Sequence, residues 1–293
     1  MTTRTPPAGL KRVIRKLGKW SLLVPWAIVC RLYLFIFARP SMQIFNDEVL
    51  YLALRGKGYN NYRSLRSSGE EAFLKLLAKH NPTLCIDIGA NKGNYSEALL
   101  GLTNSKIIAF EPLPKTFESL RTLQAKFPNR ILAINKGVGD KNAELELHFD
   151  EEYSEFASLS TEINEIDYIG EMNSNVVMVE VTTLDSFFET LKDMDVSQID
   201  LLKIDTEGYE YEVLVGAEAT LRDKKPKFIQ IEYNWHQLFK NQSLFKLASQ
   251  LPDYVPYQLL PYGSGLNKVD ARRPENNIYF FSNFVFVRKG LTI

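Results

Sequence analysis

A short apolar stretch that runs directly into a glycine-rich turn constrains this chain more than any other feature. Residues 84–88 are apolar apart from one acid, Gly89 follows at once, and residues 94–100 have the pattern of an opening helix. Because glycine has no Cβ, the backbone at Gly89 can turn sharply and approach a ligand closely. A buried strand that meets a helix N-terminus in this way is typical of nucleotide-binding α/β folds.

The spacing of the glycines in this turn bears on the kind of ligand. Dinucleotide-binding turns carry G-x-G-x-x-G, whereas here three residues separate Gly89 from Gly93. Asp87, one residue before the strand ends, can place a carboxylate at the mouth of the turn, where it suits a cationic or hydroxyl-bearing ligand. The turn therefore favours S-adenosylmethionine over NAD. The alternative is an ordinary strand-to-helix connection with no ligand.

A second acid follows the next predicted strand. Residues 105–110 are mostly apolar and end at Glu111, which lies 24 positions after Asp87 (111 − 87). An acid in this place can accept hydrogen bonds from both hydroxyls of a ribose. The alternative is that Glu111 only caps the helix that begins at Pro114. A third predicted strand, 131–134, leads into the turn 137–140, which offers a place for an adenine.

The rest of the chain alternates strand and helix patterns, as a mostly parallel α/β sheet requires. We expect further strands at 143–149, 175–183, 199–204 and 228–232, helices at 70–79, 117–127, 184–191 and 239–251, and a closing hairpin of strands 278–281 and 284–287 that turns at Ser282 and Asn283. The strand 199–204 delivers Asp205, Glu207 and Gly208 to the same edge of the sheet as the glycine turn.

Several of these segments occur together in one order: 87–93, Glu111-Pro112, 137–140, the Thr-Thr-Leu-Asp run 182–185, and KIDTEGYEYEVLVGA over 203–217. With them, about residues 83–235 resemble the FkbM family of S-adenosylmethionine-dependent methyltransferases. The IDTEGYE segment is the most specific marker, although the family often has valine where this chain has Thr206. The resemblance implies a Rossmann-like class I methyltransferase fold, with a seven-stranded, mostly parallel sheet, an antiparallel closing strand and an N-terminal helical extension. It also implies O-methylation of sugars or other hydroxyl-bearing natural products.

The resemblance also implies a role for individual residues. The methionine end of the cofactor would be held by Asp87, Gly89, Ala90, Asn91 and Gly93. Glu111 would hold the ribose, and Val138 and Asp140 would lie by the adenine. The second signature, which carries Asp205, would face the methyl group, and its Glu207 and Gly208 would contact the substrate.

Methyl transfer to a sugar hydroxyl needs a group that helps to remove the proton. Asp205 and His236 are the candidate catalytic residues, because both follow strand ends at the ligand edge. His80 precedes the core and His148 lies on a half-exposed strand, so we expect neither to act. A divalent ion held by Asp205 and Glu207 is an alternative. The sequence has no zinc-binding spacing and no Walker loop, which argues against zinc and against nucleotide hydrolysis.

The first 40 residues differ in charge from the rest of the chain. They carry eight basic residues and no acid, so although the formal net charge is +0, the remainder has 27 basic (35 − 8) and 35 acidic residues. An apolar stretch over 20–38 is interrupted by Arg31, whose burial in mid-membrane would cost at least ~2.5 kcal/mol. We expect a helix at an anionic membrane surface, with Trp20, Trp26 and Tyr33 near the headgroups. A helix packed on its own domain or on a second subunit is the alternative.

The predicted organisation is a basic apolar segment over 1–40, a helical extension over 41–82 and a methyltransferase domain over 83–293. Cys30 and Cys85 are few and far apart, which indicates a reduced, cytoplasmic protein, peripheral to the inner face of a membrane if the first segment binds lipid. The acidic body argues against a nucleic-acid partner and for a small-molecule or glycan substrate.

The favoured function is O-methylation of a sugar, glycan or lipid-linked glycan, and other functions compete with it. One is methylation of a small natural product. A Rossmann-like oxidoreductase would need the dinucleotide fingerprint, which is missing. A non-catalytic, membrane-associated binding module on a methyltransferase fold would not need the acids that stand at three strand ends.

Overall fold

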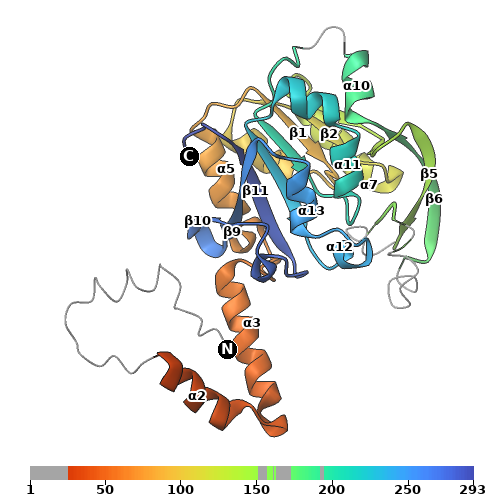
Figure 1. The fold of residues 1–293 in the computed structure, drawn as a ribbon. Coiled ribbons are helices and arrows are strands. Elements are labelled where there is room, and N and C mark those ends of the chain that lie inside the picture. Colours follow the sequence, from red (N-terminus) through yellow and green to blue (C-terminus); the bar gives the residue numbers. More distant parts are fainter. Residues whose placement is uncertain (1–25, 151–156, 161, 163–172, 192–194) are drawn as a thin grey trace. The chain divides into compact units, whose positions relative to one another are not determined.

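The computed structural model describes residues 26–150, 157–160, 162, 173–191 and 195–293 (Figure 1). The chain divides into two compact units, Met1–Leu54 and Arg55–Ile293. The described part of the first unit contains helix α2 (Trp26–Phe37), a 3-10 turn (Pro40–Met42) and most of helix α3 (Gln43–Lys57). The predicted boundaries after residues 40 and 82 stay predictions.

The second unit is built on an eight-stranded sheet with the order β10-β9-β11-β8-β7-β1-β2-β3. Its strands are β1 (Leu84–Ile88), β2 (Lys106–Phe110), β3 (Ile131–Ile134), β7 (Leu201–Ile204), β8 (Phe228–Tyr233), β9 (Tyr254–Leu260), β10 (Gly265–Lys268) and β11 (Ser282–Arg288). The pairs β1–β2, β2–β3, β1–β7 and β7–β8 are parallel, and β11 runs antiparallel between β8 and β9. This confirms the predicted sheet with its antiparallel closing strand, to which β10 adds an edge strand.

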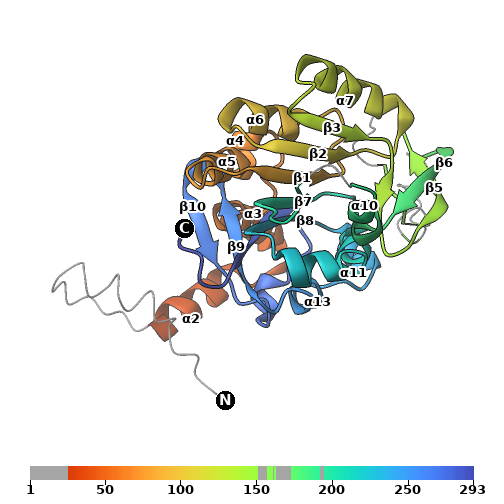
Figure 2. The same ribbon diagram turned by 90° about the horizontal axis from the view of Figure 1, so that it is seen from above.

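Helices cover both faces of this sheet, as Figure 2 shows. One face carries α5 (Glu70–Ala78), α6 (Asn94–Leu102) and α7 (Pro114–Lys126), and the other carries α10 (Leu184–Thr190), α11 (Glu210–Val215) and α13 (Leu244–Ser249). Leu74, Leu99 and Leu120, one from each helix of the first face, are fully buried in one apolar cluster. Every residue of β1 is buried, because helices lie on both of its sides.

A smaller sheet lies beside the main one and contains β4 (Gly137–Val138), β5 (Ala143–Phe149) and β6 (Asn175–Thr182) in the order β4-β6-β5. The strands β5 and β6 were expected from their alternating pattern, and the structure confirms both. Their inward side chains, among them Leu147 and Val181, form a separate apolar cluster with Leu113. This small sheet places Val138 beside the carboxyl ends of the main strands.

Two predictions for the C-terminal part are wrong. The expected strand 284–287 lies within β11, but residues 278–281 form no strand, and Ser282 and Asn283 are buried in β11 rather than turning. Gln258 donates a hydrogen bond to the Ser282 hydroxyl (3.0 Å), and Gln230 donates to the Asn283 side-chain oxygen (2.8 Å), so neighbouring strands satisfy these polar groups.

The predicted helix 239–251 is broken into α12 (His236–Phe239) and α13. The Ser243 hydroxyl accepts a hydrogen bond from the Lys246 N–H and begins α13 anew.

Within the described residues, no single helix is both long and apolar enough to cross a membrane. Only when taken together are the helical segments Ile28–Phe37 and Pro40–Lys57 long and apolar enough for a membrane span, and the chain bends by 98° between them.

Candidate active site

A cavity of about 380 Å³ opens at the carboxyl ends of β1, β2, β7 and β8. Its walls include the glycine turn, the residues just after these strands, and part of the small sheet. Among the predicted site residues, those that line it are Gly89, Ala90, Asn91, Glu111, Val138, Asp205 and Glu207. Ligands of open α/β sheets bind at this edge, so the fold places the cavity where a cofactor is expected.

The glycine turn is held against the ends of two neighbouring strands. The N–H groups of Gly89 and Ala90 both donate to the carbonyl oxygen of Phe110, at 3.0 and 2.8 Å. Gly89 has a φ of 78°, and a Cβ there would lie 1.7 Å from the carbonyl oxygen of Asp205. Only glycine fits this position, and its close approach brings the ends of β1, β2 and β7 together.

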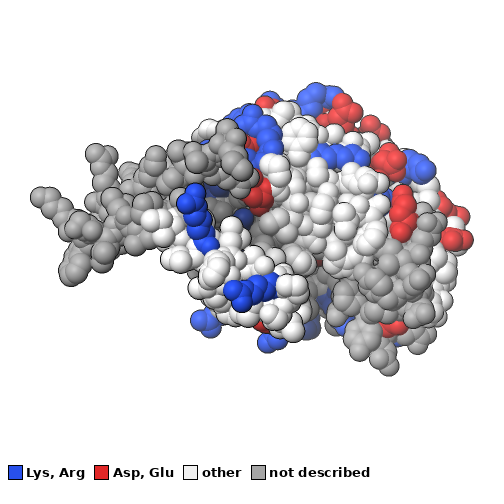
Figure 3. All heavy atoms as spheres, turned by 60° about the horizontal axis from the view of Figure 1, so that its bottom comes forward, with Lys and Arg blue, Asp and Glu red and all other residues white. Residues whose placement is uncertain are grey.

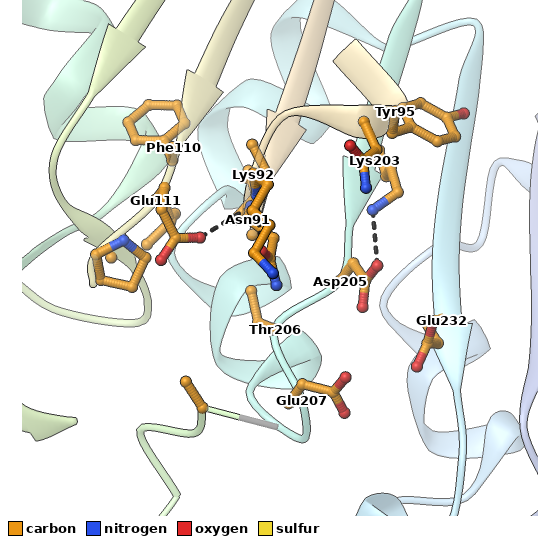
Figure 4. A pocket seen from close by; sticks show the side chains of 18 of the residues that line it. Asn91, Lys92, Tyr95, Phe110, Glu111, Lys203, Asp205, Thr206, Glu207 and Glu232 are labelled. Atoms are coloured by element: carbon orange, nitrogen blue, oxygen red, sulfur yellow. Dashed lines mark hydrogen bonds and ion pairs between the residues drawn. The ribbon is translucent and has the colours of Figure 1, made fainter. Parts of the chain in front are cut away.

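Glu111 joins the end of β2 to the glycine turn. Its carboxylate accepts hydrogen bonds from the backbone N–H of Asn91 (2.9 Å) and of Leu113 (2.9 Å). Burial raises the pKa of Glu111 to about 7, although these two hydrogen bonds oppose the shift. In Figure 4, Glu111 lies on one side of the turn, and Asp205 and Glu232 lie on the other. The carboxylate of Glu111 can therefore serve as a contact for a ribose, as a structural contact with the backbone of Leu113, or as both.

Asp87 lies beneath the turn rather than at its mouth, which corrects the predicted placement. It is fully buried and outside the cavity lining, and it accepts a hydrogen bond from the Ser96 hydroxyl (2.7 Å). The Lys203 ammonium lies 3.7 Å from Asp87 and 2.8 Å from Asp205. Burial alone would lower the pKa of Lys203, but the carboxylates of Asp205 and Asp87 outweigh it and raise that pKa. Lys203 stays charged and fixes Asp205 at the cavity.

Three carboxylates meet at the end of the cavity away from Glu111. Oxygens of Asp205, Glu207 and Glu232 lie within 4.8 Å of one another (Figure 4). The Asn234 amide donates to Glu207 (3.2 Å) and to Glu232 (3.0 Å), so it holds two of them side by side. Burial raises the pKa of Glu232 well above its ordinary value, and the charges of Asp205 and Glu207 add to this. Oxygen donors so arranged suit a divalent cation such as Mg²⁺.

His236 and Gly208 lie behind this cluster and not in the cavity lining. His236 is 2% exposed, and its Nδ1 lies 2.8 Å from a carboxylate oxygen of Glu207. Gly208 is buried and donates its N–H to Glu210. Glu207 itself has a φ of 51°, a left-handed backbone conformation that is uncommon for this residue type. The structure therefore places His236 where it can orient Glu207.

The remaining predicted cofactor residues differ in their surroundings. Val138 is buried and lines the cavity, as expected for a contact with an adenine. Gly93 lies outside the lining with a φ of 87° and begins α6, where a Cβ would meet Leu120 at 3.0 Å. Asp140 is exposed and also lies outside the lining.

Sequence reasoning missed many residues of the cavity, among them Glu232, Tyr62 and Glu70. Glu232 is the fifth residue of β8, and its place near a strand end was the signal that could have found it. Tyr62 and Glu70 come from the segment before the first core strand, where no motif marks them. Burial raises the pKa of Glu70, whose carboxyl group accepts hydrogen bonds from Ser68 (2.7 Å) and Gln230 (2.8 Å).

Comparison with known proteins agrees with this geometry. Residues 87–255, more than half of the chain, match the family described as "Methyltransferase FkbM domain". The chain belongs to the FkbM methyltransferase family. It is therefore an S-adenosylmethionine-dependent methyltransferase, and the strand order of its sheet is that of the class I fold.

Two relatives with assigned activities are similar over much of their length. The 2-O-methyltransferase NoeI of Sinorhizobium fredii is 25% identical over 199 residues, which cover 65% of this chain and 79% of NoeI. The hexuronic acid methyltransferase AglP of Haloferax volcanii is 25% identical over 171 residues, which cover 58% of this chain and 64% of AglP.

Among solved structures, a methyltransferase FkbM from Methylobacillus flagellatus is 16% identical with a TM-score of 0.43, and the match covers 70% of this chain and 43% of that one.

Proposed function

We propose that this enzyme transfers the methyl group of S-adenosylmethionine to a hydroxyl of a sugar within a glycan or lipid-linked glycan. The observation that carries the proposal is that one cavity extends from Glu111 to the carboxylates of Asp205, Glu207 and Glu232. Its Glu111 end is suited to a nucleoside. The two relatives named for 2-O-methylation and for hexuronic acid methylation support a sugar acceptor.

The cofactor fits the Glu111 end of the cavity. Glu111 would accept hydrogen bonds from the ribose hydroxyls, Val138 would contact the adenine, and the turn from Gly89 to Asn91 would hold the methionine end. When bound, S-adenosylmethionine supplies a methyl group on a positively charged sulfur. The acids Asp205 and Glu207 lie close enough to the turn to favour that charge. Asp87, Gly93 and Asp140 would act on the cofactor only indirectly, because none of them lines the cavity.

Asp205 is our first candidate for assisting loss of the acceptor proton. Its carboxylate lines the cavity, and the ion pair with Lys203 fixes its position. Asp205 would act either as the general base or as a ligand of a divalent ion that lowers the pKa of the acceptor hydroxyl. In the second case Asp205 and Glu207 would hold the ion, and Glu232 would complete the donor set. For His236 we propose that it positions Glu207, and for Gly208 that it shapes the turn beside the substrate.

The charge of the cavity bears on the acceptor. The carboxylates of Asp205 and Glu207 line it, and the buried ammonium of Lys203 pairs with Asp205. Burial raises the pKa of Glu232 and of Glu70, which also line the cavity, and so favours their uncharged forms. Without a divalent ion the carboxylate of Glu207 favours an uncharged sugar over a uronate, because like charges repel. With an ion bound, a uronate carboxylate becomes acceptable as well.

For residues 1–40 we propose contact with an anionic membrane at the inner, cytoplasmic face. Support comes from their eight basic residues without an acid and from the two free cysteines, of which Cys85 is buried. Residues 1–25 lie outside the described residues. A chain that lacks residues 1–40 is expected to bind anionic vesicles more weakly at low salt and to bind S-adenosylhomocysteine unchanged. Equal vesicle binding by the shortened and the full chain would contradict the proposal.

Transfer of an isotope-labelled methyl group tests the acceptor class. The protein is incubated with deuteromethyl S-adenosylmethionine and either cell-envelope glycans or a small-molecule extract, and the products are analysed by mass spectrometry. We expect label on the carbohydrate fraction. Label only in the small-molecule extract would favour a natural-product methyltransferase. Binding of S-adenosylhomocysteine with no label in either fraction would favour the non-catalytic alternative.

A further inference from the structure

Exposed large apolar side chains are much denser along the described part of the first structural unit than along the rest of the described chain. Of the 25 large apolar side chains exposed in the described chain, 13 lie between Ile28 and Leu52. The most exposed on each helix are Phe35 of α2 (73%) and Ile44 of α3 (80%). Single exposed apolar residues are ordinary, but a dense group of them marks a surface that binds a partner or a membrane.

The apolar surface of α2 extends around the whole helix. Residues 32–36 (Leu32, Tyr33, Leu34, Phe35 and Ile36) are all exposed and apolar. At about 100° per residue, these five consecutive positions turn through a full circle. A helix packed on one protein partner needs an apolar stripe only about 100° wide. A second copy of the chain would therefore leave much of α2 in water, whereas lipid can surround it.

The corner between α2 and α3 is fixed by specific contacts. The Tyr33 hydroxyl donates to the Asn46 side-chain oxygen (2.6 Å), and the Asn46 amide donates to the carbonyl oxygen of Phe37 (3.0 Å). The rings of Phe37 and Phe45 stack with their centroids 4.8 Å apart. The two helices thus present their apolar side chains as one bent element and not as a loose tail.

The length and charges of this element limit how deep it can lie. The 12 residues of α2 span about 18 Å, against about 30 Å of bilayer hydrocarbon. Arg31 on α2 and Asp47 and Glu48 on α3 are exposed charges that avoid the hydrocarbon centre. In Figure 3, which turns the lower side of Figure 1 forward, uncharged atoms make up much of the described surface and basic groups stand singly among them.

From these observations we infer that α2 and the part of α3 up to Leu54 form a monotopic membrane anchor that inserts into one leaflet. The occupant of the apolar surface is the lipid acyl region, and the basic groups of Arg31 and Arg39 lie at the headgroups. This inference does not rest on the proposed methyl transfer. It differs from simple attraction to anionic lipid because insertion of apolar side chains persists when salt screens the charges.

The test uses the full chain and vesicles of pure phosphatidylcholine, which carry no net charge. Flotation is measured in about 1 M salt, where the Debye length is about 3 Å. The variants are Phe35→Asp and Ile44→Asp, both at exposed positions. The matched control is Phe245→Asp, because Phe245 is an exposed aromatic residue (51%) on α13 of the other unit. Binding of S-adenosylhomocysteine reports that each variant is folded.

We expect the wild-type chain and Phe245→Asp to float with these vesicles, and each of the other two variants to bind at least tenfold more weakly. Binding of the wild type that requires anionic lipid and disappears in high salt would overturn the inference in favour of surface attraction alone. The inference would also be overturned if the wild type does not float and instead forms a dimer without lipid, and if Phe35→Asp or Ile44→Asp dissociates that dimer. The occupant would then be a second copy of the chain. Sedimentation velocity without lipid measures whether the chain is a monomer or a dimer.

Discussion

Glu111 accepts a hydrogen bond from the backbone N–H of Asn91 at 2.9 Å, and this contact ties the end of β2 to the glycine turn after β1. The same carboxylate lines the cavity and is 7% exposed. One side chain thus shapes the turn and faces the place proposed for the ribose. Its two functions can be separated by experiment.

Replacement of Glu111 by alanine is expected to weaken binding of S-adenosylhomocysteine. Hydrogen bonds to a charged group contribute about 1.5–3 kcal/mol, which corresponds to roughly 10- to 150-fold in affinity. Titration calorimetry measures the affinity, and circular dichroism checks the fold. Glu118→Ala is the control, because Glu118 is an exposed acid on α7 that pairs with the exposed Arg121. An affinity for Glu111→Ala within threefold of wild type would show that Glu111 is only structural.

The affinity should also depend on pH through Glu111. Burial raises the pKa of Glu111 to about 7. Ribose hydroxyls that donate to the carboxylate favour its charged form, so the bound state has the lower pKa and binding releases a proton. Affinity should therefore fall as pH drops below about 7, by at most about tenfold per pH unit, and level off above it. Calorimetry across this range should show no such slope for Glu111→Ala, and an unchanged slope would assign it to another group.

Gly89→Ala is expected to destabilise the protein and abolish cofactor binding. The added Cβ would lie 1.7 Å from the carbonyl oxygen of Asp205, so the ends of β1 and β7 must separate. Alanine at a positive φ costs more than about 1 kcal/mol even without a clash. Gly101→Ala is the control, because Gly101 lies in α6 with nothing near its added Cβ and should gain up to about 1 kcal/mol. Urea unfolding with equal midpoints for the two variants would be incompatible with the described turn.

Much of the fold could be predicted because its strands are short apolar runs that end in polar residues. The strands β1, β2 and β7 are of this kind, and parallel strands bring Glu111 and Asp205 to one edge. Strand β11 could not be predicted in the same way. Its buried Ser282 and Asn283 look like a turn in the sequence, and only the side chains of Gln258 and Gln230 on neighbouring strands make their burial favourable.

The candidate site was predictable to a similar extent. Residues of the glycine turn and of strand ends were found, because local sequence places them there. Tyr62 and Glu70 reach the cavity only through the packing of the preceding segment, which no local pattern reveals. His236 was expected at the ligand edge, but its side chain turns toward Glu207. A strand end fixes where a residue is and not which way its side chain points.

The cofactor preference can be checked with two ligands. We expect calorimetric heat with S-adenosylhomocysteine and none with NAD, because the turn from Gly89 to Gly93 does not have the G-x-G-x-x-G spacing of dinucleotide-binding turns. The control ligand is adenosine, which should bind more weakly because it lacks the methionine end. Heat with NAD and none with S-adenosylhomocysteine would refute the cofactor assignment.

The role of Asp205 is tested by its replacement with asparagine, which keeps the size of the side chain and removes the charge. General-base catalysis contributes roughly 100-fold or more to a rate, so turnover should fall by that amount. Affinity for S-adenosylhomocysteine, whose sulfur carries no charge, should stay nearly normal. Treatment with a chelator separates the two proposed roles. Activity that is lost and then restored by Mg²⁺ indicates a metal ligand, and activity that is indifferent to the chelator indicates a base.

The most direct measurement of the central proposal is transfer of a deuterated methyl group to the carbohydrate fraction by wild-type protein and by Asp205→Asn side by side. Affinity for S-adenosylhomocysteine is measured on the same samples. We predict labelled carbohydrate with the wild type, a rate at least about 100-fold lower with the variant, and equal affinities within about threefold. Full activity of Asp205→Asn would contradict the proposed site, and absence of label in carbohydrate with the wild type would contradict the proposed acceptor.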